Sequence, residues 1–437
     1  MLAVEHLNFP SIGDDELVEL FEPLKALPSL AVAVSGGADS MALMLMLVAW
    51  RRLTGENAPE LSVLSVNHGL RREAAQEVQL VAEISRQYGL PHQAFSWDGS
   101  KVDGNISANA RNARYDLMCE WCAQQRISHL LVAHTLDDQA ETVLLRLARG
   151  SGVDGLSAMA TSRMWNNTVI YRPLLCVERS RLLQLMIDTQ CPYVDDPGNH
   201  DLKYDRVRFR QALALLEPLG IDAHGLAQTA GRLAQARAAL DVASVQVIAR
   251  SVEIFDAGFC ILDPEQLEHH PYEIRRRVLS RLLRAVAGHT YAPAHAPLAK
   301  VLAWVQARDR PTRTLGGCLL MARQGKIWIM RETGRGVLPE ILLRPGQNLV
   351  WDGRIRVALS AAAENPLTVK ALGVENYARI KPLLKTSLNY PSALAAGLPS
   401  FWHSDELYAV PHLDFCVGDC LCQIEADFAN SGQLTEF

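Results

Sequence analysis

A short run rich in glycine, serine and aspartate has the composition of a phosphate-binding loop. The apolar residues 31–34 lead directly into a six-residue run that comprises Ser35, Gly36, Gly37, Ala38, Asp39 and Ser40. Glycines let backbone N–H groups approach an anion closely, and a following helix adds unpaired donors. Asp39 would repel phosphate unless a cation lies between them, so we expect Asp39 to hold Mg²⁺ beside a nucleotide. A tight turn with Asp39 as the helix cap is the simpler alternative.

Two carboxylates lie one helical turn apart in a second segment, AHTLDDQAET at residues 133–142. In a helix, one apolar face would be formed by Ala140, Val143, Leu144 and Leu147. Asp138 and Glu141 then lie together elsewhere on the helix, where we expect them to face a crevice. Such a pair suits the ammonium group of a small substrate. The same spacing fits a capping box, with Thr135 as the N-cap and Asp138 returning a hydrogen bond.

Histidines and arginines accompany these two segments. His68 and His134 each stand at the end of a predicted strand. Each can reach a nucleotide or a base there, or can be an ordinary hydrogen-bonded loop histidine. Arg71, Arg111 and Arg114 can counter phosphate charges, with a solvated helix face as the alternative.

Two further groups of basic residues suggest contacts with nucleic acid. Phosphate binding depends on local clusters of arginine and lysine rather than on the total charge of a chain. Solvated helix faces are again the alternative. The first group comprises Arg206, Arg208 and Arg210, and the second comprises Arg275, Arg276, Arg277, Arg281 and Arg284.

The elements that must position these residues alternate between short β-rich runs and helical stretches. Strands are predicted at residues 30–34, 61–67, 92–97, 127–134 and 168–171. This alternation predicts an α/β domain with a parallel sheet covered by helices. Ligands of such sheets bind beyond the carboxyl ends of the strands, so the loops after Val34, Val66 and Ala133 should line one crevice.

The later part of the chain has a different pattern. Alanine- and leucine-rich sequence predicts long helices at residues 226–252 and 272–287, and short alternating runs with glycine turns follow residue 334. We therefore predict a catalytic domain at residues 1–219, a helical domain at 220–335 and a small mixed α/β domain at 336–437.

Composition excludes several classes of protein. No apolar run of the 437 residues approaches the ~20 that a membrane-spanning helix needs, and the first residues lack a secretory signal. Nine unevenly spaced cysteines are not a dense disulfide framework. We expect a cytoplasmic protein with reduced thiols and no membrane contact. Its formal net charge of −5 provides no general attraction to nucleic acid.

The complete run SGGADS resembles the signature of the PP-loop ATP pyrophosphatase superfamily. Further motifs resemble the tRNA(Ile)-lysidine synthetase family within it, over roughly residues 30–215. They are VNHGLR at 66–71, NARNARY at 109–115, AHTLDDQAET at 133–142, LLRLARGSG at 144–152 and RPLL at 172–175. The segment 195–210 is similar too, but Gly198 and Val207 stand where the family usually has serine and asparagine.

The resemblance implies a reaction of ATP, with Mg²⁺, that joins free L-lysine to C2 of the wobble cytidine in the CAU anticodon of tRNA(Ile). The cytidine would first be adenylated, and the product would read AUA instead of AUG. Asp39, Asp138, Glu141, His134 and Arg114 would be catalytic, and the loop 35–40 with His68 would bind ATP. Substrate contacts would come from Asp138, Glu141, Arg71, Arg111, Arg206 and Arg208. The family is often dimeric, which implies a homodimer.

Two alternatives remain at this point. Cys119 and Cys122 form a CxxC pair that a PP-loop tRNA cytidine thiolase would use for an iron–sulfur cluster, although both fit the core of an amphipathic helix. A non-catalytic RNA-binding protein built on the same domain is the alternative from another class.

Overall fold

The computed structural model describes residues 9–67, 74–97, 106–195, 201–203, 205–289, 291–334, 336, 338–384, 390–417 and 423–435. The chain divides into two compact units, Met1–Arg237 and Ala238–Phe437. Each unit has its own sheets and its own apolar core. The predicted division into three domains stays a prediction.

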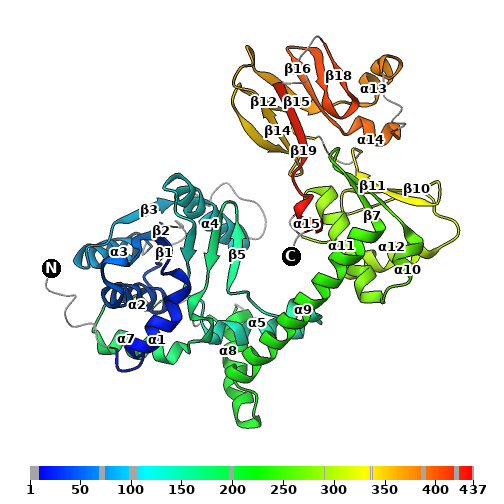
Figure 1. Ribbon diagram of the computed structural model, residues 1–437. Helices are drawn as coiled ribbons and strands as arrows, with labels where there is room; N and C mark the ends of the chain where they lie inside the picture. Colours follow the sequence, from blue (N-terminus) through cyan, green and yellow to red (C-terminus); the bar gives the residue numbers. More distant parts are fainter. Residues whose placement is uncertain are drawn as a thin grey trace. The chain divides into compact units, whose positions relative to one another are not determined.

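The first unit is built on a six-stranded sheet with the order β3-β2-β1-β4-β6-β5 (Figure 1). Neighbours from β3 to β6 run parallel, and β5 at the edge is antiparallel to β6. Its strands are β1 (Ser29–Ala33), β2 (Glu60–Asn67), β3 (His92–Ser96), β4 (His129–Leu131), β5 (Ser162–Trp165) and β6 (Thr168–Tyr171). The five predicted strands are all present, whereas β5 was not predicted.

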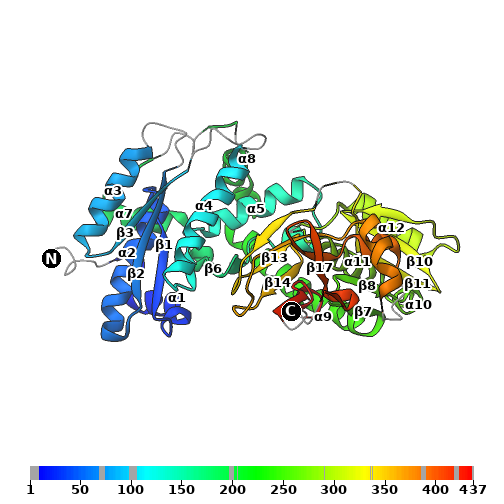
Figure 2. The same cartoon turned by 90° about the horizontal axis from the view of Figure 1, so that it is seen from above.

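Helices cover both faces of this sheet. They are α1 (Asp14–Phe21), α2 (Ala38–Thr54), α3 (Ala74–Gln87), α4 (Ile106–Gln124), α5 (Leu136–Ala148), α6 (Val153–Leu156), α7 (Arg179–Asp188) and α8 (Asp205–Leu216), with short 3₁₀ turns between some of them. Alternate residues of β1 point to opposite faces, so Leu30 and Val32 pack with α2, α3 and α7 while Ala31 packs with α4. Figure 2 shows α3 and α4 on opposite sides of the strands.

The strand order reverses between β1 and β4, which is where ligands bind in doubly wound sheets. β1 leads into residues 34–40 and β4 leads into residues 132–138, so these two loops leave neighbouring strands at the same edge. The loop after β2 falls on residues 68–73, outside the described residues. The sheet topology therefore brings together two of the three loops that the sequence assigned to one crevice.

The second unit contains three antiparallel sheets. Their orders are β7-β8-β11-β10-β9, β12-β15-β16-β17-β18 and β13-β14-β19. The first is formed by β7 (Val252–Phe255), β8 (Phe259–Leu262), β9 (Arg313–Leu315), β10 (Cys318–Arg323) and β11 (Lys326–Arg331). The others are formed by β12 (Ile341–Leu343), β13 (Asn348–Trp351), β14 (Ile355–Leu359), β15 (Leu367–Ala371), β16 (Pro399–His403), β17 (Glu406–Val410), β18 (Phe415–Cys416) and β19 (Ile424–Phe428).

Helices of this part of the chain include the two that the sequence predicted, α9 (Ala223–Ser251) and α11 (Tyr272–Ala287). α9 extends across the division between the units. The others are α10 (Pro264–Glu268), α12 (His295–Gln306), α13 (Val374–Ile380), α14 (Ser392–Ala396) and α15 (Gly432–Thr435). The sheet β7–β11 within residues 220–335 was not predicted, because its strands of three to six residues carry little periodicity beside long helices. No helix in the described residues is long and apolar enough to cross a membrane.

Candidate active site

The predicted phosphate loop lies between β1 and the amino end of α2. Ser40 Oγ accepts a hydrogen bond from the backbone N–H of Ser35 at 3.1 Å and donates one to the Gly37 carbonyl at 2.9 Å. Ser35 Oγ lies 3.3 Å from Ser40 Oγ. The two serines therefore hold the shape of the loop, and Asp39 in the first turn of α2 lies beside it.

Gly36 is the loop position that requires glycine. Its φ of +89° lies in the left-handed region, which side chains other than glycine adopt with strain. Gly37 has an ordinary φ of −73° and caps the amino end of α2. A Cβ at Gly37 would approach no atom of the described residues closer than 3.8 Å, so local packing does not require glycine there. A ligand that approaches the backbone at Gly37 would be a physical reason for the missing side chain.

α5 begins with the capping box that the sequence offered as an alternative. The backbone N–H and the hydroxyl of Thr135 donate to Asp138 Oδ2 at 2.9 and 3.0 Å, and Thr135 Oγ1 accepts from the Asp138 backbone N–H at 3.4 Å. These bonds use only one carboxylate oxygen. Asp138 Oδ1 points to another partner, so the cap and a role in the site are compatible.

That partner is Arg179, a residue that the sequence analysis did not single out. Arg179 Nε lies 3.0 Å from Asp39 Oδ2, and Nη2 lies 3.3 Å from Asp138 Oδ1. Nη1 lies 3.6 Å from Glu141 Oε1. A single guanidinium thus joins the phosphate loop to both carboxylates of α5. A signal was available in principle, because three carboxylates predicted at one crevice require a compensating cation.

Glu141 is the most deeply buried of the three carboxylates, with a side chain only 1% exposed. Arg210 on α8 donates from Nε to Glu141 Oε1 at 2.7 Å. α5 and α8 pack through Ala140, Leu144 and Leu213, which places Arg210 at this point. Leu147, expected on the same apolar face, is instead exposed because α5 is near its end there. Glu141 in this conformation is contacted by protein cations rather than open to the crevice.

Burial and Arg179 act in opposite directions on the three carboxylates. Burial raises the pKa of Asp39 and of Glu141, and the nearby guanidinium groups offset only part of this effect. For Asp138, burial also raises the pKa, but Arg179 and the Thr135 N–H outweigh it, so the net pKa is lowered. Burial lowers the pKa of Arg179, but the same carboxylates outweigh it, so the net pKa is raised. Asp138 is therefore the carboxylate that this environment holds most firmly in its charged form.

His134 lies near Asp138 and contacts Arg111. Arg111 Nη2 donates to His134 Nε2 at 3.2 Å, which leaves the ring proton on Nδ1. Burial lowers the pKa of His134 to about 3. The charge of Asp138 opposes this effect, and the charges of Arg111, Arg172 and Arg206 add to it. His134 is neutral at physiological pH and is available as a hydrogen-bonding group rather than as a cation.

The remaining predicted residues lie in different places. Arg114 is exposed, with its guanidinium 5.9 Å from the centre of the Tyr115 ring. Arg208 pairs with Asp205 on the exposed side of α8 and is not brought to the carboxylates. His68 and Arg71 lie outside the described residues.

Several polar atoms of the site are buried without a hydrogen-bond partner among the described residues: Asp39 Oδ1, Glu141 Oε2, Arg179 Nη1 and His134 Nδ1. Asp39 Oδ1 is a carboxylate oxygen beside a phosphate loop, which is the type of ligand that Mg²⁺ prefers. In the described part of the chain, no group of three or more His, Cys, Asp and Glu side chains could hold a metal ion. A cation here would need phosphate oxygens as further ligands, as Mg²⁺ with a nucleotide has.

Cys119 and Cys122 lie in an apolar cluster of the first unit. Both lie in α4 with side chains at most 1% exposed. Burial raises the pKa of Cys119 to about 11 and that of Cys122 to about 12. Deeply buried thiols that stay protonated are poor metal ligands, so the contacts of this pair favour a core role over the iron–sulfur alternative.

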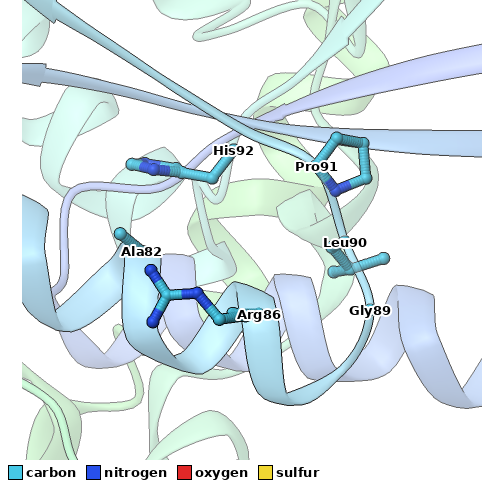
Figure 3. A pocket seen from close by; sticks show the side chains of 6 residues that line it. All are labelled: Ala82, Arg86, Gly89, Leu90, Pro91 and His92. Atoms are coloured by element: carbon cyan, nitrogen blue, oxygen red, sulfur yellow. The ribbon is translucent and has the colours of Figure 1, made fainter.

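A separate pocket of about 500 Å³ lies beside the start of β3 (Figure 3). Its lining residues are Ala82, Arg86, Gly89, Leu90, Pro91 and His92. The amino end of β3 is at the opposite edge of the parallel sheet from the phosphate loop. The pocket contains none of the predicted site residues and adds nothing to the site.

Comparison with known proteins identifies the family. A model of the PP-loop domain matches residues 12–216. The tRNA(Ile)-lysidine synthase of Ruegeria pomeroyi is 38% identical over 404 residues, which are 92% of this chain and 93% of that protein. The enzyme of the same name from Rickettsia felis is 31% identical over 409 residues, with coverage of 92% and 93%. A U34-tRNA thiolase from Methanococcus maripaludis aligns at 18% identity and a TM-score of 0.44, over 50% of this chain and 77% of that one, too distant a likeness to assign a function. This chain belongs to the tRNA(Ile)-lysidine synthase family.

Proposed function

We propose that this chain joins L-lysine to C2 of the wobble cytidine in the CAU anticodon of tRNA(Ile), at the expense of ATP. As a member of its family it is an ATP-dependent ligase that modifies tRNA. The change would convert recognition of AUG to recognition of AUA. The observation that carries the assignment of roles is the contact of Arg179 with Asp39, Asp138 and Glu141, because it joins a phosphate loop to the two carboxylates suited to an amine.

The reaction proceeds in two substitutions. The C2 carbonyl oxygen of cytidine attacks the α-phosphorus of ATP, and pyrophosphate leaves. The ε-amine of lysine then attacks C2 and loses a proton, and the C–O bond breaks to release AMP. Adenylation supplies the leaving group that a carbonyl lacks, and an anticodon loop exposes its base at low unstacking cost.

Residues 35–40 would bind the phosphates of ATP through backbone N–H groups of the loop and the amino end of α2. Asp39 would hold Mg²⁺ through Oδ1, which has no hydrogen-bond partner among the described residues. Mg²⁺ supplies compensation for the charge on the departing pyrophosphate. Asp39 would then bind the metal through Oδ1 and contact Arg179 through Oδ2.

Asp138 and Glu141 would attract the amino acid, and the arginines would attract the RNA. Arg111 donates to His134, and the charge of Arg206 also acts on this histidine, whose neutral ring can accept and donate hydrogen bonds beside a base. Arg114 is exposed and stays a candidate for phosphate contact. Arg208 pairs with Asp205, so we assign it to the outer surface of α8. The reaction would take place in the cytosol, where tRNA is found, and a homodimer stays a prediction.

The decisive experiment uses the purified chain with ATP, Mg²⁺, radiolabelled lysine and an unmodified tRNA(Ile) transcript that carries CAU. Label is expected in the anticodon nucleotide after digestion, with one AMP released for each lysine incorporated. A transcript with UAU, which lacks the cytidine, is the substrate control, and Arg181→Gln is the protein control because Arg181 pairs with Glu16 away from the site. AMP release without label would indicate another nucleophile, such as sulfur, and absence of both would refute the enzymatic assignment.

A further inference from the structure

Arg179 connects two regions of the site that bind different substrates in the proposed reaction. Nε contacts Asp39 beside the phosphate loop, whereas Nη2 and Nη1 face Asp138 and Glu141 on α5. These carboxylates would otherwise attract an ammonium group. The guanidinium of Arg179 occupies the position beside Asp138 and Glu141 that suits such a group, so an amino acid bound there must compete with Arg179.

The backbone of Arg179 is held firmly while its side chain keeps some freedom. Arg179 is the first residue of α7, and its N–H donates to Asp137 Oδ2 at 2.8 Å. The Leu136 N–H donates to the Val177 carbonyl at 3.0 Å, which ties the same segment to α5. The side chain is 18% exposed and its Nη1 has no hydrogen-bond partner in the described part of the chain. Rotation of the side chain, without movement of the backbone, can therefore redirect the guanidinium.

A nucleotide changes the balance of charges around this group. Guanidinium binds phosphate oxygens at least as well as carboxylates, often through two parallel hydrogen bonds. Phosphates bound by the loop would lie next to Asp39, within reach of a group that is already 3.0 Å from it. As the guanidinium turns to the phosphates, Asp138 loses its contact at 3.3 Å, while Glu141 keeps Arg210 at 2.7 Å. The carboxylates of α5 then attract an ammonium group more strongly.

We infer that Arg179 is a positioning residue that couples the two substrates. Its guanidinium contacts Asp138 and Glu141 and would be drawn to the phosphates of bound ATP, so that lysine binds more tightly to the nucleotide-loaded protein. The inference rests on the proposed function, because it takes lysine as the amino acid. Coupling of this kind is reciprocal, so lysine must strengthen nucleotide binding by the same factor.

The test measures the dissociation constant of L-lysine by titration calorimetry on the full chain. Unmodified tRNA(Ile) transcript is present throughout, and titrations are made with and without Mg²⁺ and α,β-methylene ATP, in which the bond between the α and β phosphorus atoms cannot be cleaved. For the wild type we expect lysine to bind about 5- to 150-fold more tightly with the analogue, the usual range of coupling between sites. Equal affinities in the two titrations would overturn the inference.

Variants separate coupling from a merely structural role. Arg179→Gln is expected to bind lysine without nucleotide at least as tightly as the loaded wild type, and to lose the dependence on nucleotide. Arg179→Lys, which keeps a point charge, should keep part of the dependence of lysine binding on nucleotide. Arg181→Gln, two residues along α7 and paired with Glu16, should keep the full ratio. Weak binding by Arg179→Gln in both titrations would show a structural role only. Failure of the wild type to bind lysine at all would refute the proposed function itself.

Discussion

Asp138 uses its two carboxylate oxygens for different purposes, and substitutions can separate them. Oδ2 closes the capping box with Thr135, and Oδ1 contacts Arg179 at 3.3 Å. Asp138→Asn can keep an oxygen in the cap but places an NH₂ group against a guanidinium. If Asp138 attracts the lysine amine, the charge-assisted contact with that amine is also lost. Such a contact is worth about 1.5–3 kcal/mol, which corresponds to an increase of roughly 10- to 150-fold in the KM for lysine.

Thr135→Ala has the complementary effect. It removes the cap hydroxyl, leaves the carboxylate charge, and is expected to lower the free energy of unfolding by about 1–2 kcal/mol with the KM for lysine nearly unchanged. Thr135→Ser, which keeps the hydroxyl, is the matched control. Urea denaturation followed by circular dichroism gives the stabilities, and AMP release at varied lysine gives the KM. The reasoning is refuted if Asp138→Asn keeps the wild-type KM, or if Thr135→Ala raises it as much as Asp138→Asn does.

Three further predictions concern the loop, the cation and pH. Gly36→Ala should cost about 1–3 kcal/mol of stability because of its positive φ, whereas Gly37→Ala should leave urea denaturation unchanged and weaken ATP binding. Asp39→Asn should weaken binding of Mg²⁺-ATP in titration calorimetry but not binding of metal-free ATP. Burial lowers the pKa of His134 from 6.5 to about 3, so between these values the unfolded chain binds one more proton and stability falls as pH falls. His134→Gln should reduce this slope by up to about 1.4 kcal/mol per pH unit, measured by denaturation from pH 7 to 4.5.

Local sequence patterns predicted those parts of the site that depend on neighbours in the chain. A strand, a glycine loop and a helix follow each other at residues 29–54, and the capping box spans Thr135 to Asp138. The short strands β7 to β11 escaped prediction because pairing across a sheet, rather than their own periodicity, defines them. The exposure of Leu147 also depends on where α5 ends, which spacing alone does not determine.

Arg179 shows why the charge balance of the site could not be predicted from spacing. It is separated from Asp39 by 140 residues and from Asp138 by 41, and no periodicity relates them. The sequence allows either a capping box or a substrate role for Asp138. A carboxylate has two oxygens, however, and the fold gives each its own partner. Alternatives assigned to one residue need not exclude each other when its atoms point to different groups.

The distribution of charge explains how a chain with a formal net charge of −5 can attract polyanions. Arg179 and Arg210 compensate the carboxylates of the site. The charges of Arg111, Arg172 and Arg206 act on His134, which burial keeps neutral, so that histidine adds no repulsion to theirs. The amino end of α2 offers backbone N–H donors to a phosphate at the loop. The proposed attraction of this site for ATP and RNA would therefore be local, and it should weaken with salt while the buried contacts of Arg179 persist.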